Sequence, residues 1–240
     1  MGYVWDQIRG ALPLITHGNP YIINLVWVSI RVALISTSAA LVIGLPIGLA
    51  LGLGRFRGRR ALQILANASL ALPSVVVGIA VLLLVLPDGV LGSLQIEFSI
   101  QAVYIAQAIL ALPFIVALTP AAIQGLPPGL LDQARALGAG RVQLSLLALR
   151  EARVALLAAV IAALGATLSE VGAVVIVGGN FQGHDETLAS ALLEQFNYTG
   201  HDPIATAIAI VLLALILVLA ALLTVIQQRT GGIQLRFRTA

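Results

Sequence analysis

One carboxylate, Glu170, lies in the interior of a long apolar stretch, residues 154–177. An acid inside a membrane-spanning stretch is expensive to bury, so Glu170 is a candidate functional residue. Together with Gly172 it could gate or tether a pathway. It could equally be protonated, or be hydrogen-bonded to Ser169, to Thr167 or to another helix. A single buried acid is weak support for a proton-coupled carrier, because such a carrier needs a relay of several.

Imidazole and carboxylate groups elsewhere in the chain raise the question of a metal site, because both are zinc ligands. The candidates are His17, His184, Asp185, Glu186, His201 and Asp202. Their separations do not match a helical ligand motif, so we interpret them as solvated loop residues and expect no metal. The chain has no cysteine, which excludes disulfides, iron–sulfur clusters and thiolate zinc sites.

Arginine supplies all 13 basic residues, and the chain contains no lysine. A Walker-type phosphate-binding loop needs a lysine that reaches the terminal phosphates of ATP. This chain therefore cannot hydrolyse ATP by that route, and we predict that it is not an enzyme. If ATP drives its function, another polypeptide supplies the ATPase.

The composition places the chain in a lipid bilayer. Of its 240 residues 60% are hydrophobic and 10% are charged, and the mean hydropathy is +1.04. Soluble domains carry roughly 25% charged residues, so too few are present to cover a surface that faces water. Soluble enzymes and disordered chains are excluded on that ground. The predicted fold class is all-α, a polytopic helical bundle that forms one transmembrane domain over residues 1–240.

Five apolar runs are long enough to cross a membrane, since a spanning helix needs about 20 apolar residues. Four are uninterrupted: residues 62–86, 100–123, 154–177 and 204–226. The fifth, residues 22–53, contains Arg31 and exceeds one untilted crossing. We place its buried part at residues 32–52, with the guanidinium of Arg31 in interfacial water.

We expect no signal peptide in residues 1–19, because they lack a basic start followed by an apolar core. An apolar stripe instead predicts a short helix at the membrane interface, where aromatic side chains are favoured. The stripe consists of Tyr3, Trp5, Ile8 and Leu12.

The arginines predict the orientation of the chain. Three segments between or after the predicted spans hold 11 of the 13 arginines: residues 55–60, 135–153 and 229–238. With five spans, all three segments fall on the same side of the membrane. The positive-inside rule makes that side cytoplasmic, so the N-terminus lies outside and the tail, residues 229–240, inside. The net charge of +3 then reflects topology and attraction to lipid, and we expect no nucleic-acid partner.

Small residues and prolines recur within the apolar runs. Glycines at four-residue spacing lie on one helix face and allow close backbone approach, either within one bundle or where the face lines a dimer seam or a pathway. Two such stripes occur: Gly44, Gly48 and Gly52, and then Gly165, Ser169 and Ala173. Prolines inside a helix remove a hydrogen bond and predict kinks. They are Pro46, Pro73 and Pro113.

The cytoplasmic loop, residues 125–150, carries helix signals of its own. Pro127 and Pro128 suit a first helical turn, and an acid near the positive end of the helix dipole follows at Asp132. Gly138 can end the helix in a left-handed conformation. Apolar positions recur on one face at Leu130, Ala134 and Leu137. A short amphipathic helix there needs lipid headgroups or a cytoplasmic partner to cover that face.

This loop resembles the conserved cytoplasmic loop of the membrane subunits of ABC importers, which runs Glu-Ala-Ala, three residues, Gly, and later Ile-x-Leu-Pro. Here Asp132 stands for the Glu, Ala134 for the second Ala and Gly138 for the Gly. Gln133 replaces the first Ala, and Ala-Leu-Arg-Glu at residues 148–151 replaces the later tetrapeptide. The resemblance implies that the residues coupling the chain to an ATPase are Asp132, Gln133, Ala134, Leu137, Gly138, Arg150 and Glu151.

A second segment is similar to the permeases of tungstate importers. It combines Arg-Glu-Ala-Arg at residues 150–153 with Ser-Glu-Val-Gly-Ala at residues 169–173 and Gly-Gly-Asn at residues 178–180. Related molybdate and sulfate permeases carry a comparable Glu-x-Gly segment. The resemblance covers residues 22–226, and five spans fit that family.

The resemblance implies a homodimer of ten spans in the plasma membrane of a prokaryote. Two cytoplasmic ABC ATPase subunits would bind ATP and magnesium, so no cofactor is expected in this chain. An external solute-binding protein would deliver the oxyanion, with tungstate favoured and molybdate next. Acidic residues on the outer side would then form its docking surface: Asp6, Asp88, Glu97, Asp185, Glu186, Glu194 and Asp202.

Hydroxyl groups within the spans could donate hydrogen bonds along a path without trapping the ion. The pathway candidates are Ser36, Ser38, Ser74 and Thr119, with Thr37 and Ser69 nearby in sequence. Alternatives remain open. The same mechanism could carry another small solute such as an amino acid, and an ion-gradient carrier or a membrane enzyme belongs to a different class.

Overall fold

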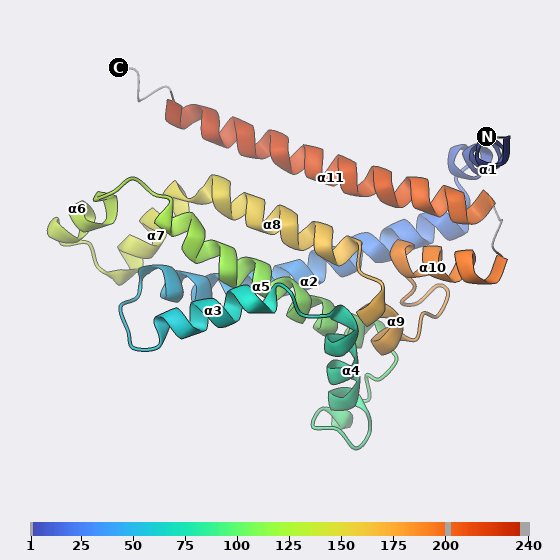
Figure 1. Cartoon of the computed structure of the whole chain (residues 1–240), viewed down its shortest axis with the longest axis horizontal. Coiled ribbons are helices and arrows are strands. Elements are labelled where there is room, and N and C mark those ends of the chain that lie inside the picture. The colour runs from blue at the N-terminus through green and yellow to red at the C-terminus, as the bar shows by residue number, and fades with distance from the viewer. Residues whose placement is uncertain (1, 200–202, 236–240) are drawn as a thin grey trace.

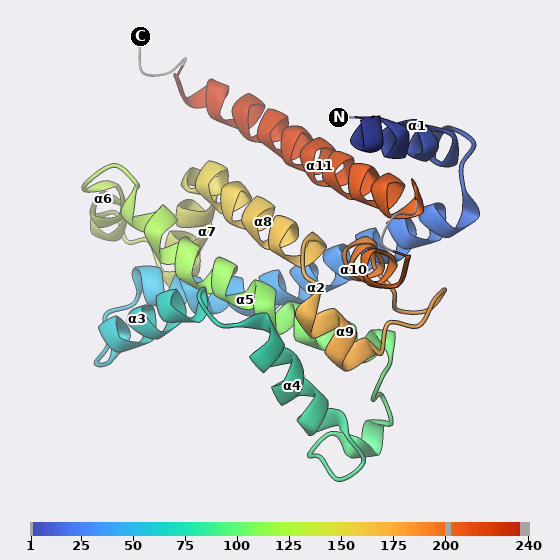
Figure 2. The ribbon, with the colours of Figure 1, turned by 45° about the vertical axis from the view of Figure 1, so that its right-hand side comes forward.

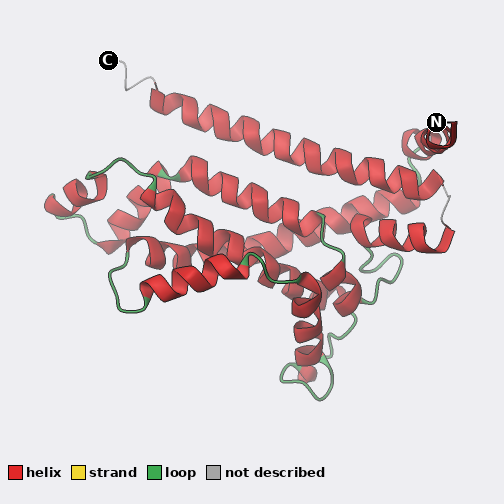
Figure 3. Cartoon of the chain, viewed as in Figure 1, coloured by secondary structure: helices red, strands yellow, loops and turns green. Residues whose placement is uncertain are grey.

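The computed structural model describes residues 2–199 and 203–235, and the described chain is helical without a strand (Figure 3). This confirms the predicted all-α class. In chain order the helices are α1 (Gly2–Thr16), α2 (Pro20–Leu53), α3 (Arg59–Ser69), α4 (Ser74–Val85), the short 3₁₀ helix η1 (Gly92–Leu94), α5 (Ile100–Gln124), α6 (Leu130–Ala136), α7 (Arg141–Glu151), α8 (Arg153–Leu168), α9 (Gly172–Gly178), α10 (Leu188–Thr199) and α11 (Pro203–Leu235).

Three helices within the described residues, α2, α5 and α11, are each long and apolar enough to cross a membrane. They contain three of the predicted spans. Asn19 begins α2 by accepting a hydrogen bond from the amide of Tyr21 at 2.9 Å. Ser99 begins α5 in the same manner, through the amide of Ala102 at 3.4 Å. Each cap satisfies one of the amides that a helix start leaves without an intrahelical partner.

The glycine stripe of α2 packs against α5 within the same chain. A Cβ added at Gly48 would lie 2.6 Å from the Cβ of Thr119. The successive contacts are Gly44 with Ile115, Gly48 with Thr119 and Gly52 with Ile123. This confirms the interpretation of the stripe as close packing within one bundle. The second stripe behaves differently, since around Gly165 no described atom lies within 4 Å of an added Cβ.

The predicted continuous span at residues 62–86 is wrong, because the chain breaks between α3 and α4 and turns by 102°. Pro73 lies at the break as the N-cap of α4. Proline has no amide hydrogen and disfavours a helical conformation at the residue before it, so it starts a new helix more readily than it continues one.

The predicted continuous span at residues 154–177 is broken as well, between α8 and α9, with a bend of 59°. Glu170 therefore lies in a break and not in a helix interior. If each bent pair crosses the membrane once, the described residues hold up to five spans. The five-span count and the orientation stay predictions.

Pro46 and Pro113 lie inside helices that continue through them, α2 and α5. Of the three prolines that were predicted to kink their helices, only Pro73 lies at a helix break. The reason is tertiary: α2 and α5 pack along their length, so lost hydrogen bonds are offset by contacts with the neighbouring helix.

The bundle is elongated, and its two ends differ in character (Figures 1 and 2). At one end lie α3, α6 and α7, and at the other lie α1 and α10. The arginine-rich segments, residues 55–60 and 135–153, share the first end, as the predicted orientation requires. Helix α4 projects from the side of the bundle, and α11 runs along α8.

Helix α1 confirms the short helix expected at the start of the chain. Trp5 and Leu12 of its stripe are exposed, and Ile8 is half-buried. The side chain of Tyr3 lies outside the described residues. The opposite face packs through Ala11 against the start of α2 and against α11.

Arg31 is exposed in the first half of α2, and its place at the membrane interface stays a prediction. Its Nε donates a hydrogen bond to the hydroxyl of Tyr104 on α5 at 2.7 Å.

Candidate functional site

The cytoplasmic loop predicted from the sequence contains two helices, α6 and α7, where one was expected. The predicted helix is present at Leu130–Ala136, with Asp132 in its first turn. The two prolines precede it in a turn, so their placement in the first helical turn is wrong. Gly129, with φ +83°, takes the N-cap position instead. Gly138 is left-handed, with φ +86°, as predicted for the residue that ends the helix.

Helix α6 stands clear of the bundle and packs mainly on α7. None of its residues is buried, and just after it Leu137 is 89% exposed. Asp132 and Arg135 form an ion pair of 2.6 Å along the solvent side, whereas Ala134 is half-buried and Gln133 is exposed. The apolar edge of the helix is thus partly uncovered at the arginine-rich end, and it ends in the exposed side chain of Leu137.

Helix α7 links α6 to the membrane bundle. Leu144 and Ala148 bury one face of it, and Ala152 joins it to α8. Arg150 is exposed and Glu151 half-buried at its last turn. A movement of α6 would therefore reach α8 through one short helix.

The structure does not bring the four predicted pathway hydroxyls together. Ser36 is buried and donates to the carbonyl of Tyr104 at 3.1 Å, and Thr119 donates to the carbonyl of Ile115 at 2.7 Å. Ser38 is exposed on α2. Ser74 alone among the four lines a cavity described below.

Glu170 caps the short helix that follows it. Its Oε1 accepts a hydrogen bond from the amide of Ala173 at 3.1 Å, so its charge faces the positive end of α9. Gly172 is needed for close packing, because a Cβ there would lie 2.9 Å from Cγ2 of Val75 on α4. The two helix breaks are therefore in contact with each other.

Between the two breaks and α5 lies a cavity of about 150 Å³, which we call the break cavity. Its polar lining consists of Ser69, Ser74, Gln107, Thr167 and Glu170. Gln107 is completely buried, and it is a site residue that was not predicted from the sequence. The available signal was an amide side chain in the middle of an otherwise apolar run.

The loop between α9 and α10 explains the Gly-Gly-Asn segment. The carboxylate of Asp185 accepts hydrogen bonds from the amides of Asn180 at 2.9 Å and Phe181 at 3.1 Å. A Cβ at Gly178 would collide with Asp185 Oδ2, and Gly179 ends α9 with φ +86°. The segment therefore has small residues where the loop packs closely against the carboxylate of Asp185.

Asp185 and Glu186 are 1% and 3% exposed, so their predicted place on an exterior docking surface, and as solvated loop residues, is wrong. Glu186 Oε1 accepts a hydrogen bond from the Tyr21 hydroxyl at 2.6 Å, and Asn180 donates to Glu194. Burial raises the pKa of both Asp185 and Glu186. Among the residues that the structure describes, no group of three or more potential ligands could hold a metal. His201 and Asp202 lie outside them.

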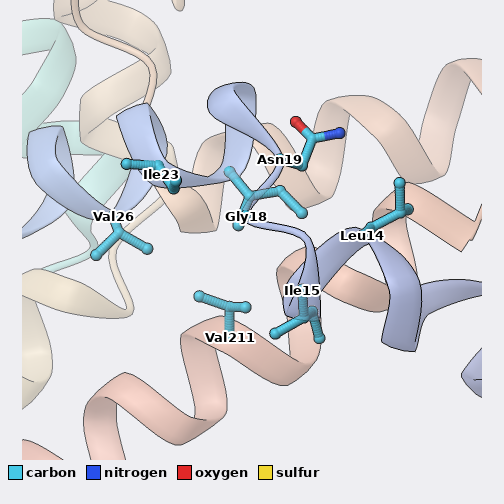
Figure 4. A pocket seen from close by; sticks show the side chains of 8 residues that line it. Leu14, Ile15, Gly18, Asn19, Ile23, Val26 and Val211 are labelled. Atoms are coloured by element: carbon cyan, nitrogen blue, oxygen red, sulfur yellow. The ribbon is translucent and has the colours of Figure 1, made fainter.

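A second cavity, of about 210 Å³, lies between the start of α2, α1 and α11 (Figure 4). Its lining is mostly aliphatic, with Asn19 as the polar side chain. Such a lining suits hydrocarbon and not an ion.

Comparison with known proteins identifies the family. Residues 44–232 match the family described as binding-protein-dependent transport system inner membrane component. The match covers most of the chain. The chain belongs to this family.

Two relatives of this inner membrane component cover nearly all of it. A probable anion ABC transporter permease of Haloferax volcanii is 36% identical over 88% of this chain and 93% of that protein. The tungstate uptake system permease TupB of Peptoclostridium acidaminophilum is 30% identical over 95% of this chain and 100% of that protein. The resemblance to oxyanion ABC importer permeases is thereby confirmed.

Among solved structures, the inner membrane component is similar to the MetNI methionine ABC transporter in an inward facing conformation. The TM-score is 0.71 at 21% identity, over 89% of this chain and 99% of that one. At this identity the likeness concerns the fold alone. The fold is that of an ABC transporter transmembrane subunit.

Proposed function

We propose that this chain is the permease subunit of an ATP-driven importer that translocates an oxyanion, with tungstate as the favoured substrate and molybdate next. Helix α6 carries this proposal: it stands at the arginine-rich end, exposes Leu137, and connects to the bundle through α7. A partly uncovered apolar edge of this kind suits a groove on a cytoplasmic partner. The names of the relatives support the oxyanion as substrate.

The partners follow from the same proposal. Two copies of a cytoplasmic ABC ATPase each receive one α6, and their closure on ATP moves the spans as rigid bodies. ATP and magnesium bind to that ATPase. An external solute-binding protein delivers the oxyanion. The permease forms a homodimer in the plasma membrane of a prokaryote, with α6 and α7 on the cytoplasmic side.

Reconstitution tests the division of labour. The purified chain is placed in proteoliposomes with or without the ATPase and binding protein encoded beside it, and internal tungsten is counted by mass spectrometry. We expect ATP-dependent accumulation only with all three components. Accumulation by the chain alone would overturn the proposal in favour of an ion-gradient carrier.

The substrate is tested separately by calorimetry of the binding protein with tungstate, molybdate and sulfate. We expect tungstate to bind most tightly. If none of the three oxyanions binds while an amino acid does, the substrate is wrong and the ATP-driven mechanism stands.

A further inference from the structure

The side-chain amide of Gln107 is buried without a hydrogen-bond partner. The side chain is 0% exposed, and neither its Nε2 nor its Oε1 has a hydrogen-bond partner among the described residues. A buried polar group that is left unpaired destabilises the folded protein. Gln107 lines the break cavity, so a molecule in that cavity would satisfy it.

The N-terminus of α4 opens on the same cavity. No described side chain caps this 12-residue helix, and its first residue, Ser74, lines the cavity. The start of a helix carries about half a positive charge and unpaired amides, which favour an anion. Helices broken within the membrane use such N-termini to hold anionic substrate groups.

The other polar side chains of the break cavity determine how many donors and charges face a ligand. Ser69 and Thr167 donate their hydroxyl hydrogens to helix carbonyls, at 2.8 and 2.9 Å. The donors left for a ligand are therefore Gln107 Nε2 and Ser74 Oγ, both uncharged. Glu170 opposes an anion, but its Oε1 is engaged by the amide of Ala173 and faces α9.

The volume of the break cavity and its weakly charged lining suit an anion that passes through better than one that is held tightly. The cavity of about 150 Å³ is large enough for several waters, and therefore for an anion with four oxygens. Conduction requires binding that is strong enough to admit the ion and weak enough to release it. Neutral donors with an opposing carboxylate meet both conditions.

We propose that the break cavity is a transit site for a tetrahedral oxyanion, held by Gln107, Ser74 and the start of α4, with Glu170 limiting its residence. This rests on the proposed function for the class of ligand. Two residues then have opposite roles: Gln107 retains the ion, and Glu170 promotes its release.

Retention of tungstate by the full chain in lipid nanodiscs tests the site without transport. After equilibrium dialysis against tungstate, bound tungsten is counted by mass spectrometry. We expect Gln107→Leu to lower the affinity about tenfold or more, since an uncharged donor to an anion is lost. Glu170→Gln removes the opposing charge and should raise the affinity for tungstate by about tenfold. Gln101→Leu, an exposed glutamine on the same helix, is the matched control.

Several results would overturn the transit site. Gln107→Leu could leave retention unchanged while raising thermal stability, which indicates a water-filled cavity. Glu170→Gln could weaken retention, which indicates a site that prefers cations. No retention of tungstate, molybdate or sulfate by the wild-type chain also overturns it. These outcomes are independent of the uptake assay, whose failure with retention intact would refute the permease function instead.

Discussion

The buried carboxylates between α9 and α10 show how single residues shape the loop near the α10 end of the bundle. Asp185 is surrounded by the amides that it organises, and its neighbour Glu186 is held by one hydroxyl, that of Tyr21. Glu186 Oε2 has no partner among the described residues. A negative charge on Glu186 would have few hydrogen bonds to stabilise it. The stability of the loop should therefore depend on pH.

Glu186→Gln should stabilise the protein at pH 7. Burial raises the pKa of Glu186, so the folded protein keeps a proton that the unfolded chain has already lost. Its contribution to stability is therefore full below the ordinary glutamate pKa of about 4.3 and falls as pH rises through the raised value. The amide keeps the bond from Tyr21 without the charge. We expect Tm at pH 7 to rise by about 2 °C or more.

The measurement is thermal unfolding in detergent between pH 5 and pH 7. The variant should lose part of the pH dependence seen in the wild-type protein. Asp88→Asn changes an exposed acid and should leave the curve unchanged. A lower Tm for Glu186→Gln at pH 7 would show that the charge itself holds the loop.

Gly48→Ala tests the close approach of α2 to α5. The added Cβ would lie 2.6 Å from the Cβ of Thr119, so one helix must move. Overpacking of this kind costs about 1–3 kcal/mol, which corresponds to roughly 2–4 °C of Tm per kcal/mol. Gly165→Ala is the matched control, since no described atom crowds that position and alanine favours a helix. An equal effect of both substitutions would contradict the packing.

At the scale of elements, α6 stands clear of the bundle and contacts mainly α7. The conformation at the end of α6 depends on Gly138, whose φ of +86° strains a side-chain-bearing residue although no described atom crowds it. Gly138→Leu should weaken capture of the ATPase about tenfold, because a left-handed backbone costs about 1–2 kcal/mol there. Gly138→Asn tolerates this conformation and should bind nearly as well. Co-purification with the ATPase measures both, and equal binding by Leu and Asn variants would contradict the prediction.

The apolar edge of α6 should be needed for the ATPase and not for folding. Leu137 is 89% exposed, so Leu137→Asp should leave Tm unchanged while abolishing co-purification with the ATPase. Ala134→Asp on the same helix should also uncouple the partner. Val90→Asp, at an 84% exposed residue between α4 and α5, is the control. Unchanged capture by the Leu137 variant would show that the ATPase binds elsewhere.

At the scale of the whole molecule, the separation of two chemically different ends implies one orientation in the membrane. The chain has no cysteine, so single cysteines can be introduced without background. A membrane-impermeant maleimide should label Gln182→Cys in whole cells and Ala139→Cys only in inverted vesicles. The reverse pattern would contradict the predicted orientation.

The sequence by itself determined the class of molecule. Apolar runs of spanning length and few charges require a helical membrane protein, because hydrocarbon excludes charged groups, and the positions of the arginines along the chain predict its orientation. The bounds of α5 were predicted to within one residue, and the left-handed conformation of Gly138 was predicted as well. Both depend on neighbouring residues in the sequence, such as helix caps and glycines.

Tertiary structure decided where the apolar runs break and which polar groups meet. Pro46 and Pro73 are the same residue type in similar runs, yet only Pro73 interrupts its helix, because α5 covers the glycine face beside Pro46. Gln107, Ser74 and Glu170 are far apart in sequence and converge only when both breaks fold against α5. Burial is a property of the assembled bundle. A residue pattern can therefore predict that a chain spans the membrane, whereas the place where its polar groups gather depends on contacts between distant segments.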